Sequence, residues 1–145
     1  MRLLTVLFFA ASLSFAETPE HDAVAAVQRV FDGIAAHDGA VIRSVMLPES
    51  RIYVVRDAGA PSAVALDDLI AQIGASKSAL LERFTGSPNV LVHGRIAQVW
   101  GEYVFLRDGK ISHCGIDSAS LLNTAEGWKI TAITYTAETT GCSAR

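Results

Sequence analysis

The sequence has few cysteines, no excess of basic residues and only one long apolar run, and each scarcity excludes a class of protein. Twelve Lys and Arg against 15 Asp and Glu give a net charge of −3, so we expect no binding of nucleic acid. Beyond the N-terminus, no apolar run approaches the roughly 20 residues of a membrane span. Hydrophobic residues make up 50% of the chain, too many for a disordered protein. Four separated histidines and two cysteines lack the spacing of a zinc site, so we expect no metal and no cofactor.

The one long apolar run lies at the N-terminus. Residues 1–16 contain a basic Arg2, an apolar stretch over 3–11, and small residues at Ser14 and Ala16. This order is typical of a secretory signal peptide that is cleaved after Ala16. An uncleaved membrane anchor is the alternative, although the run is short for one. The sequence therefore predicts a periplasmic or secreted protein with a single domain over 17–145 and no membrane association after cleavage.

The only two cysteines are Cys114 and Cys142. An oxidising compartment would permit them to form one disulfide. The alternative is two unpaired thiols, one buried in a strand and one in the C-terminal tail.

The first half of the domain has helical patterns. Thr18 and Pro19 mark a helix start, an apolar stripe follows, and Gly39 ends the helix. Shorter helices are predicted over 40–46 and 66–75, with a strand over 51–56 between them. The second half indicates strands over 89–92, 95–107, 110–123 and 128–137. Helices on one side and long antiparallel strands on the other predict an α+β domain.

Asp108 and Gly109 are a strong signal for a two-residue hairpin loop. Such a loop pairs Arg107 with Lys110 and, extended along the ladder, sets Trp100 opposite Asp117. It also brings His113 and Asp117 onto one face of the sheet. A four-residue loop over 124–127 adds further residues to this face: Trp128, Ile130, Ala132 and Thr134. Both faces then carry apolar groups, so we expect a homodimer through the outer face of the sheet.

The stretches 90–105, 108–118 and 127–130, together with a late Cys142, resemble the nuclear transport factor 2-like superfamily. Within it they are similar to a bacterial branch that carries a lumazine-binding label. The resemblance implies three helices packed on a strongly curved antiparallel or mixed sheet, which together form a cone with a pocket. Ala119 departs from the pattern, because a bulky aromatic is expected there. Members of the superfamily include enzymes and binding modules, so the fold does not settle the function.

Asp117 and His113 are the candidate catalytic residues. An Asp in an apolar cone would have a raised pKa, which suits a general acid or base, and His113 could relay a proton. The two lie about 13 Å apart on a regular strand, so they would contact opposite ends of one ligand. Trp100 could stack on a flat substrate. The alternative is that His113 and Asp117 are structural.

Other side chains are candidates for ligand contacts from the pocket wall or its mouth: Tyr53, Tyr103, Arg83 and Trp128. Arg83 could hold an anionic ligand or form an ion pair. The opposite face of the sheet could line the pocket instead, with Tyr103, Ser118 and Tyr135.

Three functions follow from this pattern. The first is an exported protein that binds a small, partly apolar molecule. The second is a cofactor-independent isomerase, dehydratase or cyclase, with Asp117 as acid/base and His113 assisting. The third is a dimeric structural or interaction domain without a ligand.

Overall fold

The computed structural model describes residues 18–143, which form three helices and seven strands. The predicted signal peptide, residues 1–16, and its cleavage site lie outside the described residues. Within residues 18–143, no helix combines the length and the apolar character that a membrane crossing requires.

The helices begin and end at residues whose chemistry suits those positions. Helix α1 (Pro19–Ala36) begins after Thr18, whose hydroxyl accepts a hydrogen bond from the His21 backbone N–H. It ends before the predicted Gly39, because His37 adopts a left-handed conformation. The Asp38 side chain then caps the short α2 (Gly39–Val45). Helix α3 (Leu66–Ala75) has the predicted bounds.

The seven strands form one mixed sheet in the order β2-β1-β7-β6-β5-β3, with β4 also paired to β5. Their bounds are β1 Met46–Arg56, β2 Ser62–Ala65, β3 Leu80–Phe84, β4 Asn89–His93, β5 Ile96–Arg107, β6 Lys110–Thr124 and β7 Gly127–Ala137. Only β1 and β7 run parallel. The short strands β2 and β3 were not predicted. Strands β4 to β7 have the predicted bounds to within one residue, but β1 begins at Met46, where the sequence predicted the end of a helix and a strand only from residue 51.

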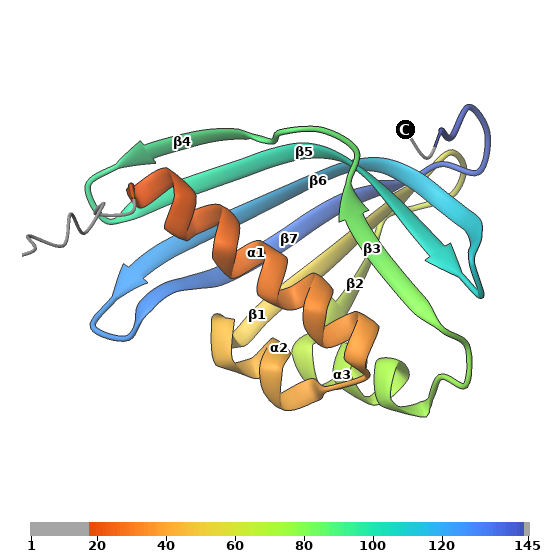
Figure 1. Cartoon of the computed structure of the whole chain (residues 1–145), viewed down its shortest axis with the longest axis horizontal. Helices are drawn as coiled ribbons and strands as arrows, with labels where there is room; N and C mark the ends of the chain where they lie inside the picture. Colours follow the sequence, from red (N-terminus) through yellow and green to blue (C-terminus); the bar gives the residue numbers. More distant parts are fainter. Residues whose placement is uncertain (1–17, 144–145) are drawn as a thin grey trace, which may run out of the picture.

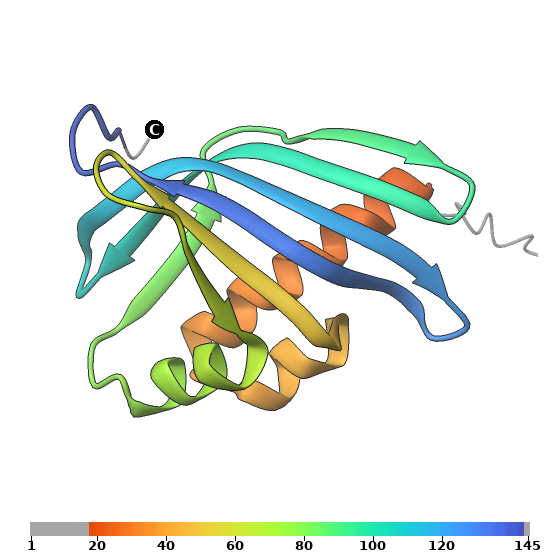
Figure 2. The same cartoon turned by 180° about the vertical axis from the view of Figure 1, so that it is seen from behind.

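Helix α1 crosses one face of the sheet diagonally, and α2 and α3 lie at one end of that face (Figure 1). Seen from behind, the sheet's other face has no helix over it in the described chain (Figure 2). The hydrophobic core lies between α1 and the covered face, and it includes Val27, Val30, Phe31, Val99, Leu121 and Ile130. This is the α+β cone that the sequence predicted.

The predicted hairpin loop is correct, but the predicted register beyond it is wrong. Arg107 pairs with Lys110, and then the register shifts so that Phe105 pairs with His113. Ser112 is therefore the extra residue of a β-bulge, and every pair beyond it moves by one. Trp100 pairs with Ser118, not with Asp117. Since side chains alternate along a strand, this shift separates Trp100 from the face that carries Asp117.

A second bulge interrupts the pairing of β6 with β7 between Ser120 and Leu121. Trp128 and Ile130 lie before it and remain on the covered face, where both are buried. Ala132 and Thr134 lie beyond it and turn to the outer face, contrary to the prediction. Ile133 and Tyr135 take their place beside Ala119 and Asp117.

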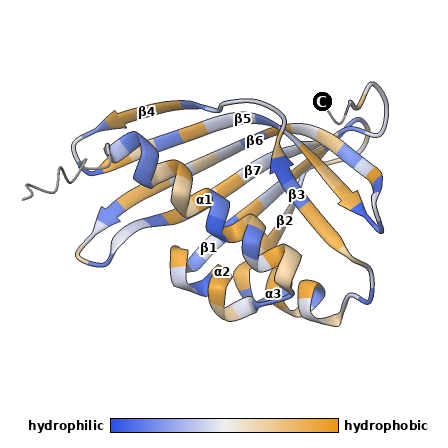
Figure 3. Ribbon diagram, viewed as in Figure 1, coloured by the Kyte–Doolittle hydropathy of each residue, from blue (hydrophilic) through white to orange (hydrophobic). Residues whose placement is uncertain are grey.

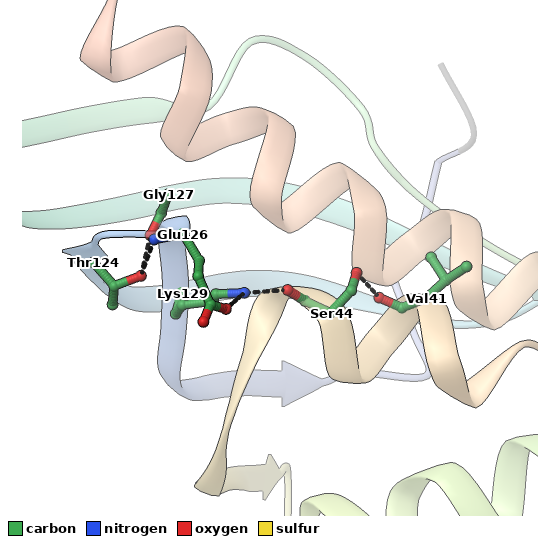
Figure 4. Close-up of polar contacts among 6 residues, drawn as sticks. All are labelled: Val41, Ser44, Thr124, Glu126, Gly127 and Lys129. Carbon is green, nitrogen blue, oxygen red and sulfur yellow. Dashed lines mark hydrogen bonds and ion pairs between the residues drawn. The ribbon is translucent and has the colours of Figure 1, made fainter.

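A small polar cluster ties the β6–β7 hairpin to α2 (Figure 4). The Lys129 ammonium donates to the carbonyl of Ser44 at 2.6 Å and pairs with Glu126 at 3.2 Å. Within the hairpin, the Thr124 hydroxyl accepts from the Glu126 N–H and donates to the Gly127 carbonyl. These contacts fasten the β6–β7 hairpin to the C-terminal end of α2.

Candidate functional site

A cavity of about 530 Å³ lies between the helices and the covered face of the sheet. This volume is within the range of small-molecule pockets. One wall consists of α1, α3 and the segment after α3. The other consists of β1, β3, β5, β6 and β7. Its apolar lining includes Val30, Phe31, Ile34, Leu69, Ile73 and Ile133, and its polar lining includes Glu82, His113, Asp117 and Tyr135.

Among the described polar residues that line the cavity, Asp117 on β6 is the most deeply buried. It is 3% exposed, and its Oδ2 atom has no hydrogen-bond partner among the described residues. Leaving a buried acceptor unpaired costs about 1–3 kcal/mol, and more if it is charged. Such groups are few in native proteins, and a role in function is one of their explanations.

Glu82 on β3 borders the same cavity. Strand β3 begins with two leucines and becomes hydrophilic toward its C-terminal end (Figure 3), where its sequence includes Glu82 and Arg83. Burial raises the pKa of the Asp117 carboxyl to about 7. Burial, and then the charge of Asp117, raise the pKa of Glu82 well above its ordinary value. Two neighbouring carboxyl groups in a cavity resist ionising together, so the pair retains at least one proton near neutral pH.

Four rings lie beside this acidic pair, because Glu82 pairs with Phe105 across the sheet and Asp117 pairs with Tyr135. The rings of Phe105 and His113 stack with centroids 4.9 Å apart, and Tyr135 lies 6.2 Å from His113 in a near-parallel orientation. Tyr103 meets His113 and Tyr135 edge to face. Burial, followed by the charges of Arg56 and Arg107, lowers the pKa of His113. His113 is therefore a neutral imidazole at pH 7, able to accept or relay a proton.

Tyr103 is structural and does not line the cavity. It is 1% exposed, and it pairs with Gly115 on β6. Its hydroxyl donates to the carbonyl of Thr136 on β7 at 2.7 Å. A Cβ atom at Gly115 would collide with Thr136, so β6 needs a glycine where this contact crosses it.

The structure does not bring the other predicted ligand-binding residues to the cavity. Trp100 is 50% exposed on the outer face, because of the bulge at Ser112. Tyr53, in the same cross-strand row, is also exposed. Trp128 is buried but does not line the cavity. On β3, Arg83 lies between the lining residues Glu82 and Phe84, and it is not itself part of the lining.

The sequence did not predict that Glu82 lines the cavity together with Asp117, because β3 was not recognised as a strand. The usable signal was alternation over 80–84, in which Leu80, Glu82 and Phe84 share one face. Tyr135 appeared only among residues of the opposite face, since the predicted register of β7 lacked the second bulge. His113 and Asp117 do share a face and line the cavity together.

Cys114 and Cys142 form a disulfide in the structure. Cys114 follows His113 on β6, and its backbone exchanges two hydrogen bonds with Glu138. The disulfide therefore fastens the C-terminal segment beside the row of rings. No group of three His, Cys, Asp or Glu side chains within residues 18–143 could hold a metal ion.

Neither a family model nor a curated protein matches the sequence. Solved structures do match: a nuclear transport factor 2-like superfamily protein from Salmonella enterica aligns with a TM-score of 0.67 and 14% identity, over 88% of this chain and 96% of that chain. The chain has the nuclear transport factor 2-like fold.

Other proteins of the nuclear transport factor 2-like fold align equally well. One from Novosphingobium aromaticivorans gives a TM-score of 0.66 with 13% identity, over 86% of this chain and 85% of that chain. Another, from Streptomyces avermitilis, carries a name that proposes a dehydratase. It aligns with a TM-score of 0.64 and 15% identity, over 83% of this chain and 98% of that chain. At these identities the likeness establishes the fold alone.

Proposed function

We propose that this protein is an exported small-molecule-binding protein whose ligand occupies the cavity lined by Asp117. The observation that carries the proposal is a largely apolar cavity of about 530 Å³ that contains a buried carboxyl oxygen without a partner. Such a site offers hydrophobic contact over most of a ligand and one polar contact that orients it.

Ala119 offers a way to test the cavity as the binding site. It is 1% exposed and its side chain lines the cavity, so the Ala119→Phe variant places a ring in the ligand space. Wild-type protein and this variant are screened by thermal shift against metabolite mixtures. We expect at least one mixture to raise the melting temperature of wild type but not of the folded variant. If no mixture stabilises wild type, the proposal loses its support.

A second candidate function is an acid/base enzyme of the isomerase, dehydratase or cyclase kind. The specific observation in its favour is that Asp117 is buried in the cavity, has a pKa near neutrality, and has Glu82, His113 and Tyr135 in the same lining. A carboxyl group that is partly protonated at pH 7 can both take and return a proton. If the hit compounds are converted by wild type and bound unchanged by Asp117→Asn, this function replaces simple binding.

A structural domain without a ligand would be favoured if large aromatic side chains filled the cavity. Of Trp100, Trp128 and Phe84, only Phe84 contributes to the lining. These three aromatic residues therefore do not fill the cavity, which favours the two functions that involve a ligand.

Export is part of the proposal. The supporting observation within the described domain is the disulfide between Cys114 and Cys142, which is typical of proteins in oxidising compartments. Mass spectrometry of the protein from the periplasm or culture medium should find Glu17 at the N-terminus. An intact Met1 in the cell pellet would contradict it.

We also propose that a second copy of the chain covers the outer face of the sheet. Trp100, Ser118, Thr134 and Tyr53 form one row across β5, β6, β7 and β1 on this face. Exposed apolar side chains on β4, β5 and β6 extend it: Leu91, Ile96 and Leu122. Several large apolar side chains exposed on one face of a sheet are typical of an interface.

A further inference from the structure

The carboxyl group of Glu82 is open to the cavity and has no partner. Glu82 is half-buried, and its side chain lines the cavity from β3. Among the described residues, neither a hydrogen bond nor an ion pair satisfies its carboxyl oxygens. The one described side-chain atom that is both unpaired and fully buried is Oδ2 of Asp117, so the unpaired oxygens of Glu82 retain accessible surface. A ligand in the cavity can therefore contact Glu82 directly.

Asp117 itself is enclosed by its neighbours. A Cβ atom at Gly101, its partner on β5, would collide with Phe84, and one at Gly115 would collide with Thr136. These two side chains therefore already fill the space next to the glycines. A ligand in the cavity meets the charge of Asp117 but does not contact its buried Oδ2 atom.

The groups beside Glu82 suit a positively charged group. Burial, and then the charge of Glu82, raise the pKa of Tyr135, whose hydroxyl also has no hydrogen-bond partner among the described residues. Phe105 pairs with Glu82 across the sheet, and its ring stacks on His113. Aromatic rings attract cations, and a hydroxyl oxygen accepts a hydrogen bond from an ammonium group. Glu82 would add a full negative charge.

The cationic residues of the lining do not neutralise Glu82. They are Lys77 and Arg107, and both are exposed, so water and salt screen their charges. Burial and the charge of Asp117 raise the pKa of Glu82, and neither cation lowers it. The lining residues of α1, α3 and β1 carry no charge. Other titratable groups lie beside the rings on β1, β5, β6, β7 and the segment after β7: Arg56, Tyr103, His113, Tyr135 and Glu138.

We propose that the cavity takes an organic ammonium compound with an apolar body, whose ammonium group pairs with the carboxylate of Glu82. The apolar body lies between the helices and the sheet, and the cation supplies the counter-charge that the described chain does not provide for the two carboxyl groups. This inference deepens the proposed function and rests on it, because it names the ligand class for the same cavity.

Binding of a cation at Glu82 should be coupled to the loss of a proton. Glu82 and Asp117 together retain a proton near neutral pH, and an ammonium group favours the state in which both are ionised. The displaced proton passes to the buffer. The affinity for an ammonium compound should therefore rise from pH 6 to pH 8, whereas the affinity for a neutral analogue should not.

The test uses matched compounds whose binding is measured by calorimetry. On a naphthalene body the probes are 2-(2-naphthyl)ethylamine, which is a cation, 2-(2-naphthyl)ethanol, which is neutral, and 2-naphthylacetate, which is an anion. Cyclohexylethylamine and cyclohexylethanol repeat the first comparison on a smaller alicyclic body. Each is titrated into wild type at pH 6 and at pH 8.

At pH 8 we expect at least one of the two amines to bind wild type 10-fold or more tightly than its alcohol, and the anion to bind more weakly than either naphthyl compound. The affinity of that amine should fall at least fivefold at pH 6. In Glu82→Gln, which keeps the shape but removes the charge, the amine should lose at least 10-fold in affinity and the alcohol less than about threefold. Glu49→Gln, at an exposed site on β1, is the matched control and should bind as wild type does.

The outcomes separate this inference from the proposed function. Equal binding of amines and alcohols, or tighter binding of the anion, overturns the ammonium class and leaves the binding function intact. A preference for the amine that persists in folded Glu82→Gln overturns the role of Glu82. If that variant does not fold, an amine affinity in wild type that is equal at pH 6 and pH 8 overturns it instead. If none of the five compounds binds, the ligand class is wrong, and the metabolite screen with Ala119→Phe decides the binding function separately.

Discussion

Glu82 and Asp117 face the same cavity although their strands, β3 and β6, lie on opposite sides of β5. The charge of Asp117 raises the pKa of Glu82, and burial raises the pKa of both. This relationship depends on the bulge at Ser112, which turns Asp117 to the covered face. It also makes the stability of the protein depend on pH.

The first prediction concerns that pH dependence. The pKa of Asp117 is about 7 in the folded protein, against an ordinary value of 3.8. The folded state therefore binds the proton more tightly, so this group's stabilisation is complete below pH 4 and is lost as pH rises through 7. The full change is about 4 kcal/mol at most.

Asp117→Asn removes this titration, so the free energy of unfolding of the variant minus that of wild type should rise between pH 4 and 7 and level off above pH 8. Urea unfolding at pH 4, 5, 6, 7 and 8 measures it, with Glu49→Gln at an exposed site as the control. A difference that stays constant or falls with pH would contradict the raised pKa of Asp117 in the folded protein.

The second prediction concerns the hydrogen bond from Tyr103 to Thr136. Tyr103→Phe leaves a carbonyl without its donor in a buried region, so we expect the variant to be about 1–3 kcal/mol less stable. Tyr53→Phe is a matched control, because Tyr53 is 41% exposed and should change stability by less than about 0.5 kcal/mol. Urea unfolding of both variants gives the comparison, and equal stabilities would contradict a structural role for Tyr103.

The third prediction concerns the disulfide. Cys114 and Cys142 are 28 residues apart in sequence, for which a loop-entropy argument gives about 3.5 kcal/mol of stabilisation. We expect dithiothreitol to lower the melting temperature of wild type. The double variant Cys114→Ala/Cys142→Ala should have the lower melting temperature without reductant and should not respond to it. A wild type that is insensitive to dithiothreitol, with free thiols detected by alkylation, would show that the bond does not form.

The fourth prediction concerns the outer face. If a second copy packs there, Trp100→Glu places a charge in the interface and should convert a dimer into a monomer. Ala35→Glu, at an exposed site on α1, should leave the dimer intact. Analytical ultracentrifugation at several concentrations distinguishes the two. A monomeric wild type would overturn the proposed dimer.

The sequence predicted the fold better than the site because the two depend on different information. Helix patterns, the Asp108–Gly109 loop and the long strands are local, and they placed α3 with its bounds correct. The face on which each side chain lies depends on register, and a single extra residue at Ser112 reverses it. The predicted hairpin register did not include this extra residue, and it therefore assigned Trp100 to the pocket face.

Asp117 and His113 were nevertheless predicted together, because they lie on one strand beyond the bulge and keep their spacing. Glu82 was not predicted as their neighbour, since it approaches through β3, a five-residue strand whose two consecutive charged residues obscure its alternation. Contacts between distant strands require the sheet order, which the local pattern does not contain.

The central claim is that the cavity around Asp117 is the ligand-binding site, and chemical-shift mapping by NMR tests it most directly. A compound that stabilises wild type is titrated into labelled protein. The account predicts that the largest backbone shifts cluster at the cavity lining, around Ile34, Glu82, Asp117 and Ala119, and that they vanish in folded Ala119→Phe. Largest shifts on the outer face around Trp100 and Ser118, or unchanged binding by Ala119→Phe, would contradict it.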